Sequence, residues 1–600
     1  MIYVSDAWKN AHEQMILPES FVEITMGVMD DTVTGTVSAK NEASFSRADA
    51  IINNEDYYSA TKYAFLEHNM WSLDGSRTIM TDVSNYYPPG YVSDDDTTDT
   101  LTITLPSVSN NSIPGFVITW SEVFETYATK FTVTVKNGNR TVGSVNVTNN
   151  TSKASIIELP VSGYNSVTIT VSEWSHPDQR GRIDSVIFGQ RIIFTKNEIV
   201  SYSHEQSGSP LGTELSKNAI EFEVDNSDGR WNPLNPSGMS KYLYERQKVT
   251  VRYGLDTISG VEWVQAGIFY LSEWRAPSNG MTATFVARDA IEFMLNATYS
   301  RPYVDAVTVF DSGTGSNARV YLTAADAVYT YKDDNLVTTL PEGTTVRVYE
   351  KTVYYFDGYG SNYDDPGVLV YRIDQGWVWG NYVQITSNMA LINDITKAMS
   401  SSVPDDVDKW VNDEITMGVN APVAIEETPT AEFIQKCLAT YGATIWQSHN
   451  GVLNATNPML GTYLSDYVIS ADFAYQHPEV ELAKPLRNVN VVQHFEYVFE
   501  PRTVAYNVNA TGEDITVDCP YLWYYETART DALAAKYIQW WKHREVVSGE
   551  FRADPRLELF DVVQVESKYG TLSPVMITYI KYTYNGSFRG TFEGKVIEEA

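Results

Sequence analysis

The sequence predicts a mainly β, multidomain protein, and three observations lead to this prediction. The chain has 600 residues, well beyond the roughly 250–300 residues at which a single hydrophobic core stops growing. Aromatic residues make up 13%, with 40 Tyr and 14 Trp, and such side chains suit a pleated, half-buried surface. Along residues 191–295, apolar runs of five to eight residues are separated by Asn, Asp, Gly and Pro turns, as in antiparallel sheets.

The first segment, residues 1–55, holds a short helix near Asp6–Gln14 and then a strand over Phe21–Met26. A strand at this position requires partners from elsewhere in the chain. Residues 191–302 carry strands of the same kind, so we interpret 1–55 and 191–302 as two parts of one interrupted domain with barrel character.

Two inserted modules account for the interruptions. Residues 56–190 contain six or seven strands and Asn-Gly turns such as Asn137-Gly138, which predicts a separate β-sandwich. Residues 303–388 contain five short strands and a long loop rich in Tyr, Gly and Asp, which fits a small closed barrel.

The remaining chain divides into an α/β region, residues 389–470, and a β-rich closing domain, residues 471–600. In the α/β region one helix face is apolar and a hairpin turns at Asn450-Gly451. The closing domain has one amphipathic helix and a last hairpin with Asn585-Gly586 at its tip. The apolar face is formed by Phe433, Ile434, Cys437 and Leu438.

The formal net charge of −33 argues against nucleic acid as a surface ligand and against anionic membranes, because phosphate binding depends on Lys and Arg. We interpret the acidity as a solubilising surface, and a negative channel lining along which DNA slides stays open as an alternative. The chain shows no secretion signal and no run of 18 apolar residues. We therefore expect synthesis in a cytosol and no stable membrane insertion.

No pattern of catalytic, metal-binding or cofactor-binding residues stands out, so we predict a protein that is not an enzyme. The eight His never take the spacing of a helical zinc site, and the loop at Asp225 lacks calcium ligands at two positions. Cys437 and Cys519 have no partner spacing and are expected to be buried apolar residues. Glycosidases need two acids about 5–9 Å apart in a cleft, which adjacent loop acids rarely provide. The adjacent acids are Asp94–Asp96, Asp364–Asp365 and Asp405–Asp406.

Three segments, residues 219–255, 266–295 and 528–598, resemble the phage tail hub family, whose members cap the tail tube and carry the tip or spike. Together with residues 389–527 the resemblance covers roughly two thirds of the chain. It implies a homo-oligomeric ring, typically a trimer, whose two barrel-like domains per subunit form a pseudo-hexameric collar. The implied partners are a distal tail or tail tube protein and tip, spike or fibre proteins, and the implied location is the distal end of the tail in the virion.

The first insertion is similar to galactose-binding-like jelly rolls, on the strength of residues 164–189. The likeness implies a platform for host cell-surface glycans, since an aromatic ring stacks on the C–H face of a sugar. Packing in the core or at an interface is the commoner role for such aromatics and stays open. Tyr86, Tyr87 and Tyr91 lie in a Pro/Gly loop, where exposure is expected. The full set of candidates is Trp71, Tyr86, Tyr87, Tyr91, Trp120 and Trp174.

The second insertion resembles a bacterial SH3-type barrel, with residues 376–385 as its closing strands. Relatives bind peptidoglycan or other partners through aromatic loops, and a spacer or subunit contact is the role that we favour here. The candidate contact residues are Tyr354, Tyr355, Tyr359, Tyr363, Trp377 and Trp379.

We therefore expect a structural hub at the distal end of a phage tail, joining tube to tip and touching host glycans through its insertions. One alternative is a receptor-binding or depolymerising tail protein that acts on host wall polysaccharide. A cell-wall hydrolase with binding modules is a third class, and the absence of a catalytic motif weighs against it.

Overall fold

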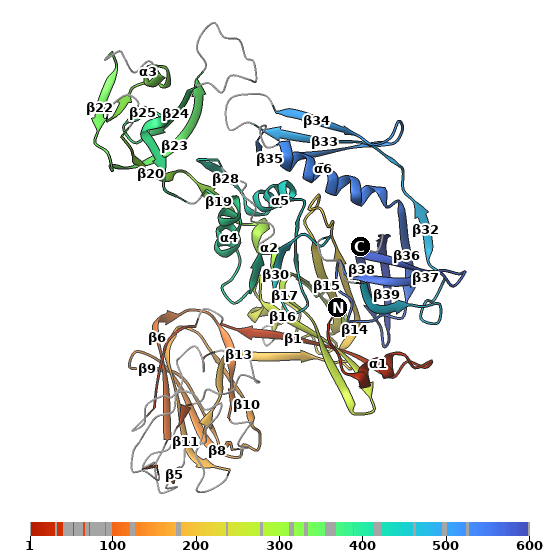
Figure 1. The fold of residues 1–600 in the computed structure, drawn as a ribbon. Helices are drawn as coiled ribbons and strands as arrows, with labels where there is room; N and C mark the ends of the chain where they lie inside the picture. Colours follow the sequence, from red (N-terminus) through yellow and green to blue (C-terminus); the bar gives the residue numbers. More distant parts are fainter. Residues whose placement is uncertain are drawn as a thin grey trace.

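The computed structural model describes most of the 600-residue chain. The described residues are 2–30, 33–39, 52, 64–65, 71–72, 90–91, 99–120, 126–175, 182–235, 238–276, 280–310, 317–328, 334–354, 368–387, 389–411, 422–459, 464–494, 501–523 and 527–597. Figure 1 shows a central body of strands from which two β modules extend in different directions. The predicted fold class, mainly β and multidomain, is confirmed.

The first part of the chain joins the central body through strand β1 (Ser20–Met29). It pairs with β13 (Ser185–Phe194) along one edge and with β16 (Lys248–Thr257) along the other. Ile24 lies opposite Val251 and shares one buried core with residues 220–224. The strand expected at Phe21–Met26 thus finds its partners far along the sequence, as an interrupted domain requires. The short helix α1 (Asp6–His12) precedes it, and its first turn is capped by Ser5.

The central body consists of two strand groups in one sheet. The first group adds β14 (Ile199–Ser207), β15 (Lys217–Asp225), β17 (Gly260–Arg275) and β18 (Thr282–Arg288) to β1 and β16. The second group comes from the end of the chain, and β38 pairs with β14 to join the groups. Its members are β31 (Leu464–Ile469), β32 (Glu479–Leu482), β36 (Glu545–Phe551), β37 (Val562–Glu566), β38 (Leu572–Tyr584) and β39 (Phe588–Val596).

Local sequence explains these strands. Buried and non-buried positions alternate along β15, as a strand with one face on a core requires. The β38–β39 hairpin turns at the expected Asn585-Gly586, where Gly586 has a φ of 102°, a conformation that L side chains rarely adopt. Both strand groups contribute to a single hydrophobic core, which runs from Ile24 to Phe592. The sequence alone did not suggest that the closing strands share this core.

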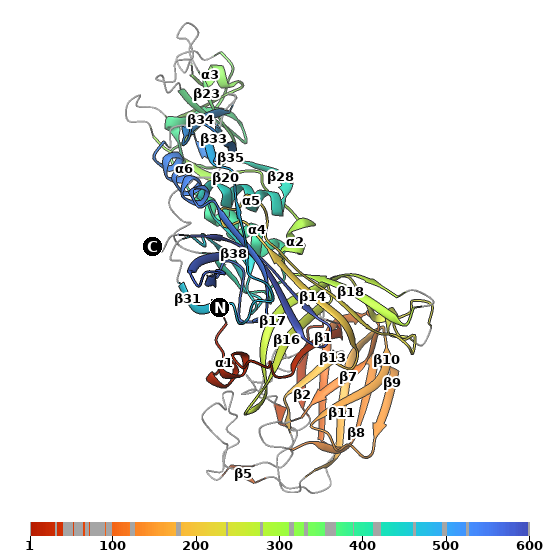
Figure 2. The same ribbon diagram turned by 90° about the vertical axis from the view of Figure 1, so that its right-hand side faces the viewer.

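The first insertion is built from two packed sheets with a core of their own (Figure 2). The Asn137-Gly138 turn joins β8 to β9 as expected. Strand β13 links module and body, since Ser185–Phe188 pair with β7 and the following residues pair with β1. Strand β2 (Thr36–Ala39) pairs with β6 and so belongs to this module, although it lies before the predicted boundary at residue 56. The other strands are β6 (Asp99–Ser109), β7 (Ile113–Thr119), β8 (Ala128–Asn137), β9 (Arg140–Val147), β10 (Ala154–Val161) and β11 (Tyr164–Trp174). Four short strands pair beside them, namely β3 (Ala64–Phe65), β4 (Trp71–Ser72), β5 (Gly90–Tyr91) and β12 (Arg182–Ile183).

The second insertion is a small sheet curled around a separate core, reached through the pair β19 (Thr298–Arg301) and β28 (Ile425–Pro429). It holds seven described strands where the sequence suggested five, together with a short helix, α3 (Ala324–Val328), that the sequence analysis did not predict. The strands are β20 (Val304–Thr308), β21 (Ala318–Tyr321), β22 (Leu336–Leu340), β23 (Thr345–Tyr354), β24 (Val368–Ile373), β25 (Gly376–Trp379) and β26 (Val383–Ile385).

The α/β region packs α4 (Leu391–Ser402) and α5 (Thr430–Tyr441) beside α2 (Ile291–Leu295). The predicted apolar helix face is confirmed, because Phe433, Ile434, Cys437 and Leu438 are all buried. Helix α5 ends at Gly442, whose left-handed φ of 61° lets its N–H bond to the last carbonyls. The helix leads into β29 (Thr444–Gln447) and β30 (Leu453–Thr456), with β27 (Lys409–Val411) beside them.

Helix α6 (Thr527–Lys542) is the predicted amphipathic helix of the closing segment. It packs between the central body and a three-stranded sheet of β33 (Leu486–His494), β34 (Arg502–Asn507) and β35 (Glu513–Trp523). Figure 1 shows this unit beside the central body, in blue. Among the described residues, no helix is long and apolar enough to span a membrane.

Candidate functional site

The structure places Trp120, a predicted glycan-stacking residue, inside the sandwich core. Its side chain is 0% exposed, and its indole Nε1 donates a hydrogen bond to Ser155 Oγ at 2.7 Å. The Trp120 ring meets Phe131 and Trp174 edge to face, with ring centroids 5.0 and 5.6 Å away. A ring enclosed in this way has no face to offer a sugar, so the prediction for Trp120 was wrong. Sequence could not separate it from a surface Trp, since both fit a β-rich segment.

The other glycan candidates divide into those that the structure describes and those that it does not. Trp174 is half-buried at the rim of the same core. Tyr86 and Tyr87 lie outside the described residues. Trp71 and Tyr91 lie opposite each other in the β4–β5 pair, of which only the backbone is described. A glycan role for Tyr86, Tyr87, Tyr91 and Trp174 stays a prediction.

The predicted contact residues of the second insertion show a similar division. Trp377 is half-buried and packs beside Tyr321 and Val370, while Trp379 meets the ring of Tyr382 at a centroid distance of 5.7 Å. Both Trp side chains therefore contribute to the packing of the module. Tyr354 is half-buried in β23. Tyr355, Tyr359 and Tyr363 lie outside the described residues, and their role stays a prediction.

Candidate groups for chemistry are sparse in the part of the chain that the structure describes. It holds no group of three or more His, Cys, Asp or Glu side chains placed to hold a metal ion. Cys437 and Cys519 are free and buried, as predicted, and burial raises the pKa of the Cys519 thiol to about 12. Of the adjacent acids, Asp406 pairs with Lys248 at 3.1 Å, and Asp94–Asp96 and Asp364–Asp365 lie outside the described residues.

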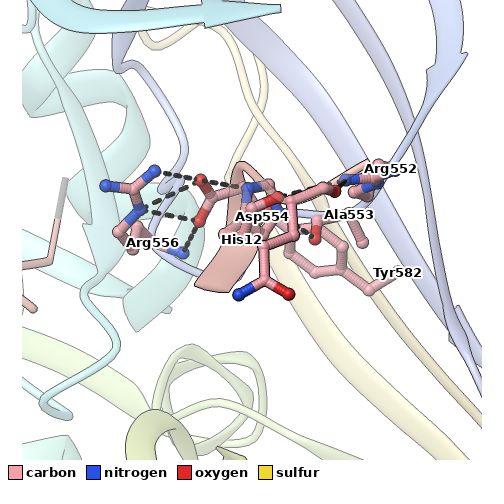
Figure 3. A network of polar contacts seen from close by, with 7 residues as sticks. His12, Arg552, Ala553, Asp554, Arg556 and Tyr582 are labelled. Carbon is pink, nitrogen blue, oxygen red and sulfur yellow. Dashed lines mark hydrogen bonds and ion pairs between the residues drawn. The ribbon is translucent and has the colours of Figure 1, made fainter. Parts of the chain in front are cut away.

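The most developed polar site joins the two ends of the chain, and Figure 3 shows it. Helix α1 lies against the loop 552–557 of the closing segment. His12 Nε2 lies 3.2 Å from the carbonyl oxygen of Ala553, and Arg552 donates to the carbonyl oxygens of His12 and Gln14 at 3.1 and 2.6 Å. We call this set of contacts the terminal lock. It connects residues about 540 positions apart in sequence.

A buried ion pair lies at the centre of the terminal lock. Arg556 Nε donates to both carboxylate oxygens of Asp554 at 2.9 Å, and Asp554 is 0% exposed. Burial acts to raise the pKa of Asp554, but the charges of His12 and Arg556 outweigh it and hold that pKa below its ordinary value. The carboxylate therefore stays ionised inside the fold.

The last hairpin completes the terminal lock. The hydroxyl of Tyr582 donates to the carbonyl oxygen of Asp554 at 2.7 Å (Figure 3), and that of Tyr584 donates to the carbonyl oxygen of Ser20 at 3.2 Å. The site was not predicted from the sequence. Asp554 and Arg556, an acid and a base two positions apart, give a weak local signal, whereas His12 and Tyr582 come close to them through tertiary folding.

The turn 448–452, between β29 and β30, lies among the strands. It and the neighbouring Gln447 form a second set of polar contacts between distant segments. Gln447 accepts from Ala290 N at 2.8 Å and donates to the carbonyl oxygen of Ile268 at 2.7 Å. The backbone N–H of His449 donates to Glu558 at 3.0 Å. This turn therefore contacts both strand groups as well as the α/β region to which it belongs.

Comparisons with known proteins show similarities in fold. A scan against protein-family models and a search of curated proteins each found no match. Among solved structures, the chain is similar to a tail protein from Neisseria meningitidis, with 7% identity and a TM-score of 0.38 over 68% of this chain and 94% of that one. It is also similar to the 43 kDa tail protein of prophage MuSo2 from Shewanella oneidensis, with 10% identity and a TM-score of 0.35 over 67% of this chain and 95% of that one.

A third likeness covers a smaller part of the chain. A chitosan-binding module of a Paenibacillus chitosanase/glucanase matches 27% of this chain over 96% of its own length, with 12% identity and a TM-score of 0.18. All these TM-scores lie below 0.5, so the function of this chain has to be argued from its own residues.

Proposed function

We propose that this protein is a structural hub at the distal end of a phage tail, which assembles as a ring, a trimer in the simplest case, between the tail tube and the tip. The observation that carries the proposal is the β14–β38 pairing. It aligns two strand groups from distant parts of the chain over Tyr202–Ser207 and Tyr579–Tyr584. The resemblance of residues 219–255, 266–295 and 528–598 to tail hub proteins falls on these same two groups.

The β14–β38 pairing supports the proposal because of the symmetry that the ring would have. Two strand groups per chain, repeated three times, would present six surfaces to a sixfold tube. Such a ring closes through head-to-tail contacts, in which different surfaces of neighbouring copies meet. The shared core makes the two groups one rigid unit, so that each copy transmits load from the tube to the tip without an internal hinge.

The insertions suit contacts at the outside of such a ring. Figures 1 and 2 both show the sandwich and the small barrel extending from the central body, at opposite ends. We assign them to neighbouring tail proteins or to the host surface, with Tyr86, Tyr87, Tyr91 and Trp174 as the glycan candidates that remain. A receptor-binding or depolymerising tail protein is the alternative function, and it shares this use of the insertions.

Measuring the mass of the assembled protein tests whether it forms a ring. Purified full-length chain is passed through size exclusion with light scattering, alone and with a candidate tail tube protein, and the particles are imaged in negative stain. The hub proposal expects a ring of three chains in at least one of the two samples. A monomer in both samples that binds host wall polysaccharide would replace the hub with the alternative.

A further inference from the structure

The interior of the first strand group holds a pair of histidines that neither the terminal lock nor the proposed function uses. His204 on β14 is 0% exposed and His449 on the 448–452 turn is 1% exposed. Their ring centroids are 6.0 Å apart. Gln206 lies between them, and its Nε2 is 3.0 Å from the Nε2 atom of each ring.

This geometry favours a neutral His449, because the amide N–H of Gln206 can donate to His449 Nε2 only if that nitrogen carries a lone pair. On His204 the Nε2 atom lies 2.8 Å from the acceptor Asn218 Oδ1, so in the neutral ring it carries the proton and Nδ1 carries the lone pair. A proton on His449 would turn its Nε2 into a donor facing the donor of Gln206. Among the described residues its other ring nitrogen, Nδ1, has no hydrogen-bond partner, so a second buried donor would be left unpaired.

Among the described residues, the groups that contact His204 are uncharged. Its Nδ1 lies 2.7 Å from the hydroxyl of Tyr253 on β16, which in turn lies 2.8 Å from the hydroxyl of Tyr202. Asn218 on β15 faces its Nε2 at 2.8 Å. The rings of Phe269 on β17 and Tyr582 on β38 enclose it, and all of these groups are neutral at the pH of a cell.

Near His449 the carboxylate of Glu558 is already engaged. Glu558 accepts the backbone N–H of His449, and its own backbone N–H bonds to Asp561. Burial lowers the pKa of both His204 and His449 to about 3. The neighbouring imidazole acts in the same direction on His204, and the positive amino terminus does so on His449.

We propose that the His204–Gln206–His449 contact is an acid-sensitive latch, which holds the 444–456 hairpin in the strand groups when both rings are neutral and releases it when they are protonated. The hairpin bonds to the strands and their loops at Gln206, Ile268, Ala290 and Glu558, and its Trp446 ring meets Phe560. Its residues Ile445, Leu453 and Ala455 pack in the core of the α/β region. The latch goes beyond the proposed function and does not depend on ring assembly.

The direction of the pH effect follows from linkage. Histidines whose pKa is lower in the folded than in the unfolded state stabilise the closed form fully above the ordinary pKa of 6.5, and this contribution is lost as the pH falls from 6.5 toward 3. Between pH 7 and pH 5, each histidine should raise the population of the open form about 25-fold.

Hydrogen exchange of the full-length chain tests the latch. After correction for the chemical exchange rate, peptides from 444–456 should exchange at least about tenfold faster at pH 5 than at pH 7, while peptides from β16 stay protected. His449→Gln keeps an acceptor near the Nε2 position and cannot take up a proton, so it should remove most of this acid response. His477→Gln, at an exposed histidine of the closing segment, is the matched control and should keep it.

Three results would overturn the latch: joint exposure of 444–456 and β16 in acid, no acceleration at pH 5, or a full acid response in His449→Gln. If that variant does not fold, exchange at the C2 position of each histidine in the unmutated protein decides the matter. His449 must then titrate well below the ordinary histidine pKa of 6.5. Titration of His449 at that ordinary value would sink the proposal.

Discussion

The two buried joints of this protein, the terminal lock and the histidine latch, connect distant segments by opposite means. The lock buries a full ion pair, Asp554 with Arg556, and surrounds it with carbonyl and hydroxyl groups. The latch buries neutral rings that share one amide, Gln206. A buried charge stays in place while its partner remains, whereas a buried neutral base is released by a single proton. The lock should therefore resist acid that opens the latch.

The largest effect is expected from breaking the ion pair. Arg556→Ala leaves the Asp554 carboxylate buried without its cation, which costs about 3–5 kcal/mol of local stability. Denaturant-dependent hydrogen exchange of residues 2–17 measures the loss, because α1 depends on the lock. The double variant with Asp554→Asn is the control and should recover part of the loss. If the single variant protects residues 2–17 as well as the parent chain does, the pair is not what holds the lock.

Removing the shared amide should have the next largest effect. Gln206→Met matches the side chain in length and leaves His449 Nε2 without its donor, at about 1–3 kcal/mol for the buried group left unpaired. The loss should appear as faster exchange in 444–456 at pH 7. Gln435→Met is the control, since Gln435 bonds only to the exposed carbonyl of Thr213. Unchanged exchange in 444–456 would show that the hairpin is held elsewhere.

The latch region also contains a carboxyl group that should lower the stability of the fold at high pH, whereas the two histidines lower it in acid. Asp289 is fully buried beside the hairpin, and burial raises its pKa to about 8. Since the unfolded group ionises near 3.8, the stability that the neutral form provides is lost as the pH rises toward 8, at about 1.4 kcal/mol per pH unit. Asp289→Asn should remove this slope between pH 5 and pH 8. Denaturant titrations at several pH values measure it, and an unchanged slope would contradict the prediction.

The smallest effect is expected from a single neutral bond in the lock. Tyr582→Phe removes the hydroxyl that donates to Asp554 O and keeps the ring in the core, at a cost of about 0.5–1.5 kcal/mol. Tyr579→Phe on the same strand is a suitable control. A loss of stability as large as that of Arg556→Ala would mean that the buried ion pair contributes no more than one neutral hydrogen bond. The comparison of the two joints would then fail.

Much of the fold could be predicted from local sequence. The Asn137-Gly138 and Asn585-Gly586 turns, the helix face of Phe433 and Cys437 and the strand at Phe21–Met26 depend on short-range patterns, and the structure has them. Trp120 shows the limit, since an aromatic residue in a β segment is equally suited to a core and to a surface. The number of strands in the second insertion was also underestimated, because strands of three or four residues give little periodicity.

The sequence by itself determined the β-rich class, the turns and the apolar faces, because these follow from the preferences of neighbouring residues. Only the tertiary structure decided that β38 pairs with β14, that His12 meets Ala553 and that His449 lies beside His204. These contacts join residues hundreds of positions apart and depend on how whole sheets pack, which no local pattern records. Both joints of the molecule belong to this second kind.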